Sequence, residues 1–147
     1  MLTDPLHRAY LAAVYRFRLP GNSGPTELRV GQRSDALLAW LQAGSHQSAT
    51  VMTAFNPGSQ RCSDQMNAAT QQQLRDTVRS SGLLFIEGQN LDPAGNWPPE
   101  DSLLIANLPL AASRDLGQRF GQVAFLWSDT TAVPQLHFTA QHRPAPR

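Results

Sequence analysis

The order of the elements predicted between residues 49 and 127 constrains the fold more than any other feature of the sequence. Apolar runs of strand length alternate there with amphipathic segments of helix length that have capping residues at their ends. The predicted elements are a strand over 49–55, a helix from Ser63 to about Ser81, strands over 83–87 and 102–108, a helix over 110–120 and a strand over 123–127. This order is that of the ferredoxin-like split βαβ unit.

The flanking segments add a few further elements. Pro5 after Asp4 predicts the start of a short helix, and alternation on either side of a Pro- and Gly-rich turn predicts a β-hairpin over 15–30. Ser34 and Gly44 bound a second helix, and 135–139 is an edge strand. We therefore expect one α+β domain over 1–139, with a mixed β-sheet whose ferredoxin-like core spans about 49 to 127. A flexible tail over 140–147 follows.

The composition excludes several classes of function. All 12 basic residues are Arg, so there is no lysine for a Schiff base or for a P-loop. The net charge of +1 gives no field that attracts nucleic acid or a membrane surface, so we expect neither partner. A single cysteine and scattered histidines show no metal-binding spacing, so no metal site is expected. The start of the chain does not resemble a signal peptide, and we expect a cytoplasmic protein.

Strand directions in a split βαβ unit bring distant polar segments together. The strands over 49–55 and 83–87 run parallel, and the other two run opposite to them. The loops over 56–62 and 88–101 and the turn Phe120-Gly121-Gln122 should therefore meet at one end of the sheet, with Trp127 and Asp129 at the other. This end is the predicted location of a binding site.

Three polar residues precede the N-terminus of the helix that begins near Ser63. Asn56, Ser59 and Ser63 lie where free backbone N–H groups and the helix dipole favour an anion. The structural alternative is that Asn56-Pro57-Gly58-Ser59 is a turn and Ser63 is a cap. The predicted buried face of this helix consists of Met66, Thr70, Leu74 and Val78.

The long loop carries carboxylates and a tryptophan. Glu87, Asp92 and Glu100 are candidates for acid–base chemistry or a hard metal ion, although Asp92 also fits a β-turn. Trp97 is either a platform for a ligand or a plug that packs the loop onto the domain. The amide of Gln122 contacts either a ligand or a loop carbonyl.

Cys62 is a candidate nucleophile only if a base lies nearby. Its place near a helix N-terminus favours the thiolate, but no histidine is adjacent in sequence. His46 or His137 would have to approach it in space.

Motifs spread along most of the chain resemble the bacterial family called domain of unknown function 3293. The resemblance covers about Tyr10 to Phe138 and implies no established activity. It rests on Leu28-Arg29-Val30-Gly31-Gln32, Thr53-Ala54-Phe55-Asn56-Pro57-Gly58-Ser59, the segment from Asp92 to Ser102 with Asn96-Trp97-Pro98-Pro99-Glu100 at its centre, and Phe120-Gly121-Gln122-Val123-Ala124. The family pattern has Asn where this chain has Val123 and Glu where it has Met66.

These observations support three hypotheses. The first is an uncharacterised protein that binds a polar or anionic small molecule at the loop-rich end of the sheet. Its site would consist of Asn56, Ser59, Ser63, Asn67, Trp97, Glu100 and Gln122. The second is an interaction module that docks through the Trp97 loop, and the third is a carboxylate-based hydrolase or metal enzyme. Cofactor, turnover and oligomeric state are left open.

Overall fold

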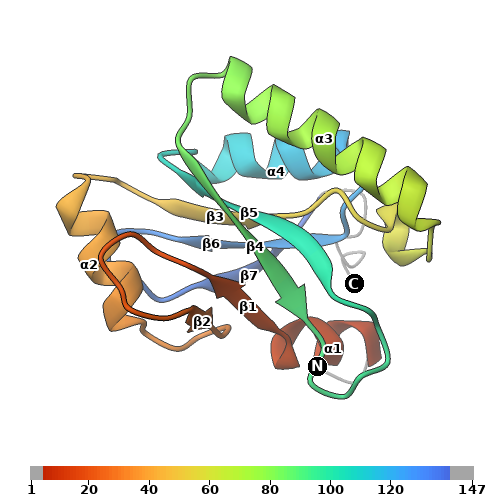
Figure 1. The fold of residues 1–147 in the computed structure, drawn as a ribbon, viewed down its shortest axis with the longest axis horizontal. Coiled ribbons are helices and arrows are strands. Elements are labelled where there is room, and N and C mark those ends of the chain that lie inside the picture. Colours follow the sequence, from red (N-terminus) through yellow and green to blue (C-terminus); the bar gives the residue numbers. More distant parts are fainter. Residues whose placement is uncertain (1–4, 140–147) are drawn as a thin grey trace, which may run out of the picture.

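The protein has an α+β fold in which four helices surround a single β-sheet, and the computed structural model describes residues 5–139 (Figure 1). The helices are α1 (Pro5–Ala12), α2 (Asp35–Ala43), α3 (Asp64–Ser80) and α4 (Leu110–Arg119), with a short 3-10 turn at Pro57–Ser59. The strands are β1 (Val14–Phe17), β2 (Thr26–Leu28), β3 (Ala49–Met52), β4 (Phe85–Leu91), β5 (Glu100–Ala106), β6 (Ala124–Ser128) and β7 (Gln135–Phe138). The predicted cap Asp4 and the predicted tail over 140–147 lie outside the described residues.

Within residues 5–139 the sheet has seven strands in the order β2-β1-β4-β5-β3-β6-β7, and each neighbouring pair is antiparallel. The prediction of a mixed sheet is therefore wrong. β3 and β4 do run in the same direction, as expected for two strands joined by a helix, but β5 lies between them and is antiparallel to both. The directions predicted for β3, β4, β5 and β6 are confirmed.

The helices divide between the two faces of the sheet. α3 and α4 lie together on one face, while α2 and α1 lie on the other (Figure 1). Side-chain alternation along the strands sorts the core accordingly. Val51 and Leu104 belong to the cluster that includes α2, whereas Met52 and Leu103 belong to the cluster on the α3 side.

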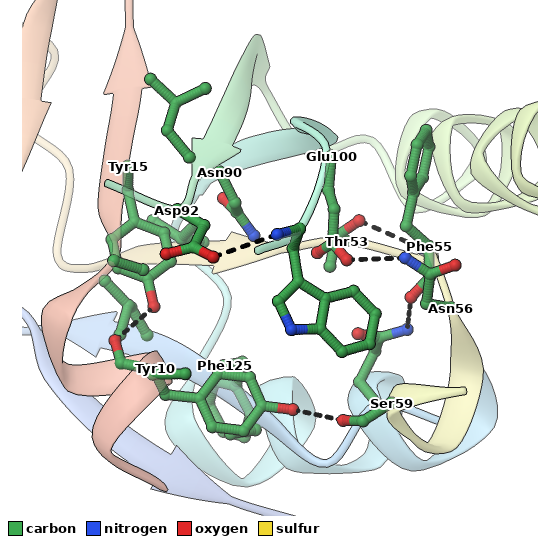
Figure 2. A pocket seen from close by; sticks show the side chains of 18 of the residues that line it. Tyr10, Tyr15, Thr53, Phe55, Asn56, Ser59, Asn90, Asp92, Glu100 and Phe125 are labelled. Atoms are coloured by element: carbon green, nitrogen blue, oxygen red, sulfur yellow. Dashed lines mark hydrogen bonds between the residues drawn. The ribbon is translucent and has the colours of Figure 1, made fainter. Parts of the chain in front are cut away.

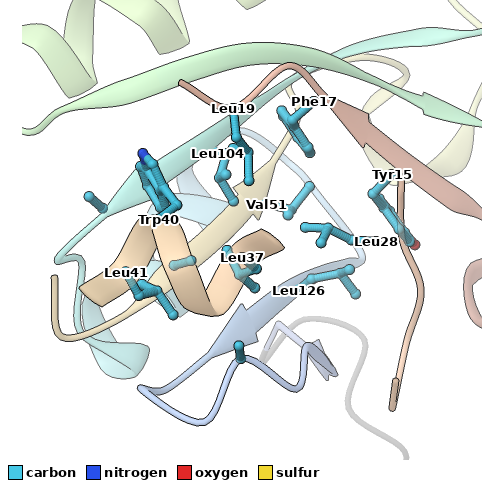
Figure 3. Close-up of a cluster of buried hydrophobic side chains, with 13 residues drawn as sticks. Tyr15, Phe17, Leu19, Leu28, Leu37, Trp40, Leu41, Val51, Leu104 and Leu126 are labelled. Carbon is cyan, nitrogen blue, oxygen red and sulfur yellow. The ribbon is translucent and has the colours of Figure 1, made fainter. Parts of the chain in front are cut away.

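The α2 cluster is densely packed. Leu37, Trp40 and Leu41 of α2 lie against the buried side chains Phe17 and Leu104 of the sheet (Figure 3). Each such side chain contributes about 1.5–3 kcal/mol by its burial. α1 lies on the same face but has no buried residue. The part of the sheet under α1 is therefore more loosely covered than the part under α2.

The predicted hairpin and the predicted ends of α2 are confirmed. Tyr15 pairs with Leu28 across the antiparallel β1–β2 hairpin. The Ser34 hydroxyl accepts the Leu37 N–H at 3.1 Å, which caps α2, and Gly44 follows its last turn. The predicted last strand is β7, which pairs with β6 at the edge of the sheet.

The buried face of α3 differs from its prediction. Met66 is 56% exposed, whereas Asn67 and Gln71 are buried beside Leu74 and Val78. The reason is that the chain after β3 leaves the sheet and its backbone donors need new acceptors. The Gln71 side chain accepts the Ala54 N–H at 2.8 Å. The spacing of apolar residues therefore places the first part of the buried face one residue too early, at Met66 and Thr70 instead of Asn67 and Gln71.

β4 extends to Leu91, four residues beyond its predicted end at Glu87. Gly88 makes the extension possible, because a Cβ there would lie 2.2 Å from the Arg16 carbonyl oxygen and 2.3 Å from the Phe17 ring. The absence of a side chain at Gly88 lets β1 pair closely with β4. The long loop therefore shrinks to the residues between Leu91 and Glu100, and Asn90 becomes a strand residue.

Within residues 5–139, none of the helices combines the length and the apolar character required to cross a membrane.

Candidate functional site

The three segments predicted to meet do so at the loop-rich end of the sheet. The Asn56 side-chain amide donates to Glu100 at 2.8 Å, and the Gln122 amide donates to the Phe55 carbonyl at 3.1 Å. The Gly58 N–H donates to the Gly121 carbonyl at 2.7 Å. Trp127 lies toward the other end, where its indole N–H donates to the Leu108 carbonyl. The predicted convergence is therefore confirmed.

The turn after β3 is built from backbone conformations that side chains seldom adopt. Asn56, Gly58 and Ser59 all have positive φ, at 50°, 67° and 61°. Asn tolerates this region better than most residues, because its short amide bonds locally. Here the Asn56 Oδ1 atom accepts the Cys62 N–H at 2.9 Å, which closes the loop.

The backbone donors of this turn are already used. The Asn56 N–H donates to Asn67 Oδ1, and the Ser59 and Gln60 N–H groups donate to carbonyls within the turn. Ser63 caps α3 by accepting the Met66 N–H at 3.1 Å. Asn56-Pro57-Gly58-Ser59 is thus a turn and Ser63 is a cap, as the structural alternative predicted. None of these contacts supplies a donor for an anion.

A cavity of about 100 Å³ lies between α1 and the sheet, and we call it the α1 cavity. Its wall combines apolar side chains with polar groups from the three segments (Figure 2). The lining residues are Leu6, Ala9, Tyr10, Ala13, Tyr15, Val51, Thr53, Phe55, Asn56, Ser59, Asn90, Leu91, Asp92, Trp97, Pro98, Glu100, Gln122, Ala124, Phe125, Leu126 and Leu136. Five of the seven predicted site residues are among them, whereas Ser63 and Asn67 are not.

α1 closes one side of the cavity. The Tyr10 hydroxyl lies 2.8 Å from the Ser59 hydroxyl, so the helix is bonded to the turn after β3 (Figure 2). The Tyr15 hydroxyl donates to the Tyr10 carbonyl at 2.9 Å and ties the end of α1 to β1. These bonds position a helix that has no buried side chain of its own.

A row of polar side chains crosses the floor of the cavity. Tyr15 of β1 pairs with Asn90 of β4, and Asn90 pairs with Glu100 of β5. Directly opposed residues of an antiparallel pair project from the same face, with Cβ atoms about 5 Å apart. Tyr15, Asn90 and Glu100 therefore project from the same face of the sheet, and all three line the α1 cavity (Figure 2).

Glu100 is the most unusual of these groups. Burial raises the pKa of its carboxyl above the ordinary value of 4.5, and the Asn56 hydrogen bond offsets part of that rise. No ion pair involves Glu100 within residues 5–139. Burial also raises the pKa of Tyr15, with smaller contributions from Tyr10 and Glu100, so its hydroxyl stays protonated. The Oδ1 atom of Asn90 is buried and has no hydrogen-bond partner in the described part of the chain.

Asp92 organises the loop that carries Trp97. Its carboxylate accepts the N–H groups of Ala94, Asn96 and Trp97 at 2.8–3.1 Å. The Gly95 N–H donates back to the Asp92 carbonyl, which confirms the predicted β-turn. Trp97 is half-buried and lines the cavity, while the Arg61 guanidinium lies over its ring outside the lining.

The predicted carboxylate group is not assembled. Glu87 lies on the opposite face of β4 from Asn90, because the two are three residues apart on a strand, and it is bonded to Arg75 at 2.8 Å. Asp92 is occupied by backbone donors, so Glu100 alone presents a carboxyl without a backbone donor to the cavity. Among residues 5–139, no three side chains of the metal-ligating types gather into a cluster.

Cys62 and the two histidines considered as its base, His46 and His137, have different contacts. The Cys62 thiol lies 3.5 Å from the Gln60 carbonyl. His46 packs against Trp40 and bonds Asn107, and His137 stacks on Phe125 at 5.7 Å. The structure therefore gives no Cys62–His pair in the described part of the chain.

The lining residues that the sequence analysis did not connect with the site include Tyr10, Tyr15 and Asn90. Tyr10 and Tyr15 were assigned to a helix and to a hairpin, without a link to the site, and Asn90 was assigned to a loop. Gly88-Gln89-Asn90 shows no alternation of apolar and polar residues, so the sequence offers no signal that the strand continues to Asn90. The tyrosines become visible only when α1 is placed over the sheet.

The two departures from the family pattern lie outside the cavity lining. Met66 is exposed on the first turn of α3, and Val123 is buried just before β6. Neither side chain lines the α1 cavity.

Comparison with known proteins identifies the family of the chain. No curated protein and no solved structure matches the chain. A family model matches residues 52–125, which is half of the chain and runs from the end of β3 to the start of β6. This range contains the turn after β3, the Trp97 loop and Gln122. The chain belongs to the family described as Protein of unknown function (DUF3293).

Proposed function

We propose that the protein binds a small molecule with an apolar body and at least one polar group in the α1 cavity. The observation that carries the proposal is the combination of an apolar wall with two polar groups whose bonding is incomplete. Glu100 has no ion pair in the described chain, and Asn90 Oδ1 has no hydrogen bond. Polar groups that converge in an apolar cavity are the usual mark of a ligand site.

The volume of the cavity limits the size of the ligand. About 100 Å³ is less than the roughly 300–1,000 Å³ of pockets for drug-sized molecules. It approaches the roughly 150 Å³ of an apolar cavity that holds benzene. The proposed ligand, or the part of it that enters, is therefore a group of a few non-hydrogen atoms.

Two further elements belong to this proposal. The order β4-β5-β3-β6, with α3 and α4 as crossovers on one face, supports a ferredoxin-like unit as the scaffold of the site. The lone cysteine Cys62 supports a cytoplasmic location, where thiols stay reduced. Turnover of the ligand is not part of the proposal.

A pair of alanines at the end of α1 provides the test. Ala13 lines the cavity, whereas Ala12 is exposed on the same segment. Fragments with about five to eight non-hydrogen atoms would be screened by two-dimensional NMR on protein labelled with ¹⁵N. We expect shifts of the Asn90 side-chain amide and the Trp97 indole N–H. Ala13→Leu should abolish them by filling the cavity, and Ala12→Leu should preserve them. Equal binding by both variants would overturn the proposal.

The docking alternative requires an apolar patch around Trp97. Trp97 instead lines the α1 cavity. The large hydrophobic side chains that are most exposed in residues 5–139, Met66 and Leu84, lie at opposite ends of α3 and form no joint patch. A cavity behind Trp97 favours the binding of a small molecule over docking.

A further inference from the structure

We propose that the ligand of the α1 cavity carries a positively charged amine, which Glu100 and Asn90 hold from neighbouring strands. This inference rests on the proposed function and narrows it to a chemical class. The sequence predicts a polar or anionic ligand, and this inference assigns the ligand a positive charge instead. The argument depends on the unsatisfied groups of the cavity, on the signs of its charges and on its aromatic wall.

Glu100 lacks the partner that a buried carboxylate needs. Its single hydrogen bond comes from the neutral amide of Asn56 at 2.8 Å. A buried charge is costly unless an opposite charge and hydrogen bonds compensate for it. An ammonium group on the ligand would supply both, and it would remain charged because the pKa of an alkylamine is about 10.

Asn90 supplies the second acceptor. Its Oδ1 atom is buried without a partner, and it lies on the same face of the sheet as Glu100, in the directly opposed position. An ammonium group has three donors and no acceptor, so it can bond both residues at once. An alcohol offers a single donor, and a carboxylate offers none. The pair of acceptors therefore selects an amine.

The charges of the lining residues also favour a positively charged ligand. None of the described lining residues is Arg or His, whereas Asp92 and Glu100 are both acidic. An anion would meet these carboxylates without a compensating cation. The Arg61 guanidinium lies over the Trp97 ring, but Arg61 is not a lining residue.

Aromatic rings complete the environment for a cation. Tyr10, Tyr15 and Trp97 line the cavity together with aliphatic side chains. Ring faces attract ammonium groups, and the same surfaces bury an alkyl body. The ligand class that fits is a short primary amine with an apolar chain or ring.

The test uses three probes that each have four carbon atoms and differ in charge. Binding of n-butylamine, 1-butanol and butyrate would be measured by NMR titration near neutral pH at constant ionic strength. We expect n-butylamine to bind at least about tenfold more tightly than 1-butanol, which corresponds to about 1.4 kcal/mol. Butyrate should bind more weakly than either.

Glu100→Gln is the matched variant, because it keeps an acceptor for Asn56 and removes the charge. It should abolish the preference for the amine over the alcohol, whereas Asp115→Asn, an equal change of charge at an exposed position on α4, should preserve it. Asn90→Leu should weaken amine binding several-fold and provides a second variant if Glu100→Gln does not fold.

The outcomes separate this inference from the proposed function. Binding of 1-butanol or butyrate as tightly as n-butylamine, or a preference for the amine that survives Glu100→Gln, would overturn the inference and leave the cavity as a binding site. Failure of all three probes, together with the failure of the fragment screen, would overturn both.

Discussion

Asn56 and Asn67 form a reciprocal pair: the Asn56 N–H donates to Asn67 Oδ1 at 2.9 Å, and the Asn67 side-chain amide donates to Asn56 Oδ1 at 3.0 Å. Both residues are buried. The pair holds Asn56 in its left-handed conformation. It also orients the Asn56 side-chain amide so that its N–H group donates to Glu100. α3 therefore positions the cavity wall without lining the cavity.

Asn67→Ala should destabilise the protein by about 3 kcal/mol, because it leaves the buried Asn56 N–H without a partner and removes one of the two donors to Asn56 Oδ1. Urea denaturation would measure the loss. Met66→Ala, at the exposed neighbouring position, serves as the control and should change stability by no more than about 0.5 kcal/mol. Equal effects of the two substitutions would contradict the role assigned to the pair.

The pH dependence of stability should report the burial of Glu100. Its pKa is raised in the folded protein, so the native state binds the proton more tightly than the unfolded chain. Stability should fall as pH rises from the ordinary value of 4.5 through the folded-state pKa and remain lower above it. Glu100→Gln should remove this fall. Urea denaturation between about pH 4 and about pH 8 gives the comparison, and parallel profiles of the two proteins would argue against it.

Gly121 should resist substitution more strongly than Gly95. Both have positive φ, at 68° and 76°, but a Cβ at Gly121 would lie 2.8 Å from Pro57 Cβ, whereas a Cβ at Gly95 meets no atom within 4 Å. Gly95→Ala should cost about 1 kcal/mol for the left-handed backbone alone. Gly121→Ala should cost about 3 kcal/mol, because the added methyl group also pushes the turn at Gly121 away from the turn at Pro57. Thermal unfolding of both variants tests the difference, and similar losses would show that the contact with Pro57 is unimportant.

His137 should titrate below its ordinary value of 6.5, because burial lowers its pKa and the Arg114 charge lowers it further. The native state then binds the proton less tightly than the unfolded chain, so stability should decrease as pH falls from 6.5 through the folded-state pKa. NMR titration of the ring protons measures the midpoint. Arg114→Gln should raise the midpoint only in part, since burial is the larger cause. A midpoint above 6.5 in the native protein would be inconsistent with the packing of His137 on Phe125.

The sequence predicts the convergence of the loops because strand order alone fixes which ends of the strands lie together. The contacts of Gln122 with Phe55 and of Asn56 with Glu100 follow from that order. Local patterns are less informative where a polar residue is buried for its hydrogen bonds. Asn67 and Gln71 read as exposed helix residues, yet they bind backbone groups of the chain after β3.

The cavity itself is not visible in the sequence. It exists because α1 lies over the sheet. The Tyr10 hydroxyl bonds the Ser59 hydroxyl, the Tyr15 hydroxyl donates to the Tyr10 carbonyl, and these two contacts hold α1 in place. Periodicity gives the helix but not its position. The position of Asn90 on a strand could not be predicted for a different reason, because Gly88-Gln89-Asn90 is polar and has the composition of a loop.

The loop closed by Asp92 has a consequence for the divergence of related sequences. Because one carboxylate holds the backbone from Ala94 to Trp97, the shape of the loop does not depend on the indole ring. Replacement of Trp97 by another side chain alters the cavity wall and leaves the turn beneath it intact. Under the proposed function, a single substitution at Trp97 would change the ligand preference of the cavity without a change in the loop that carries it.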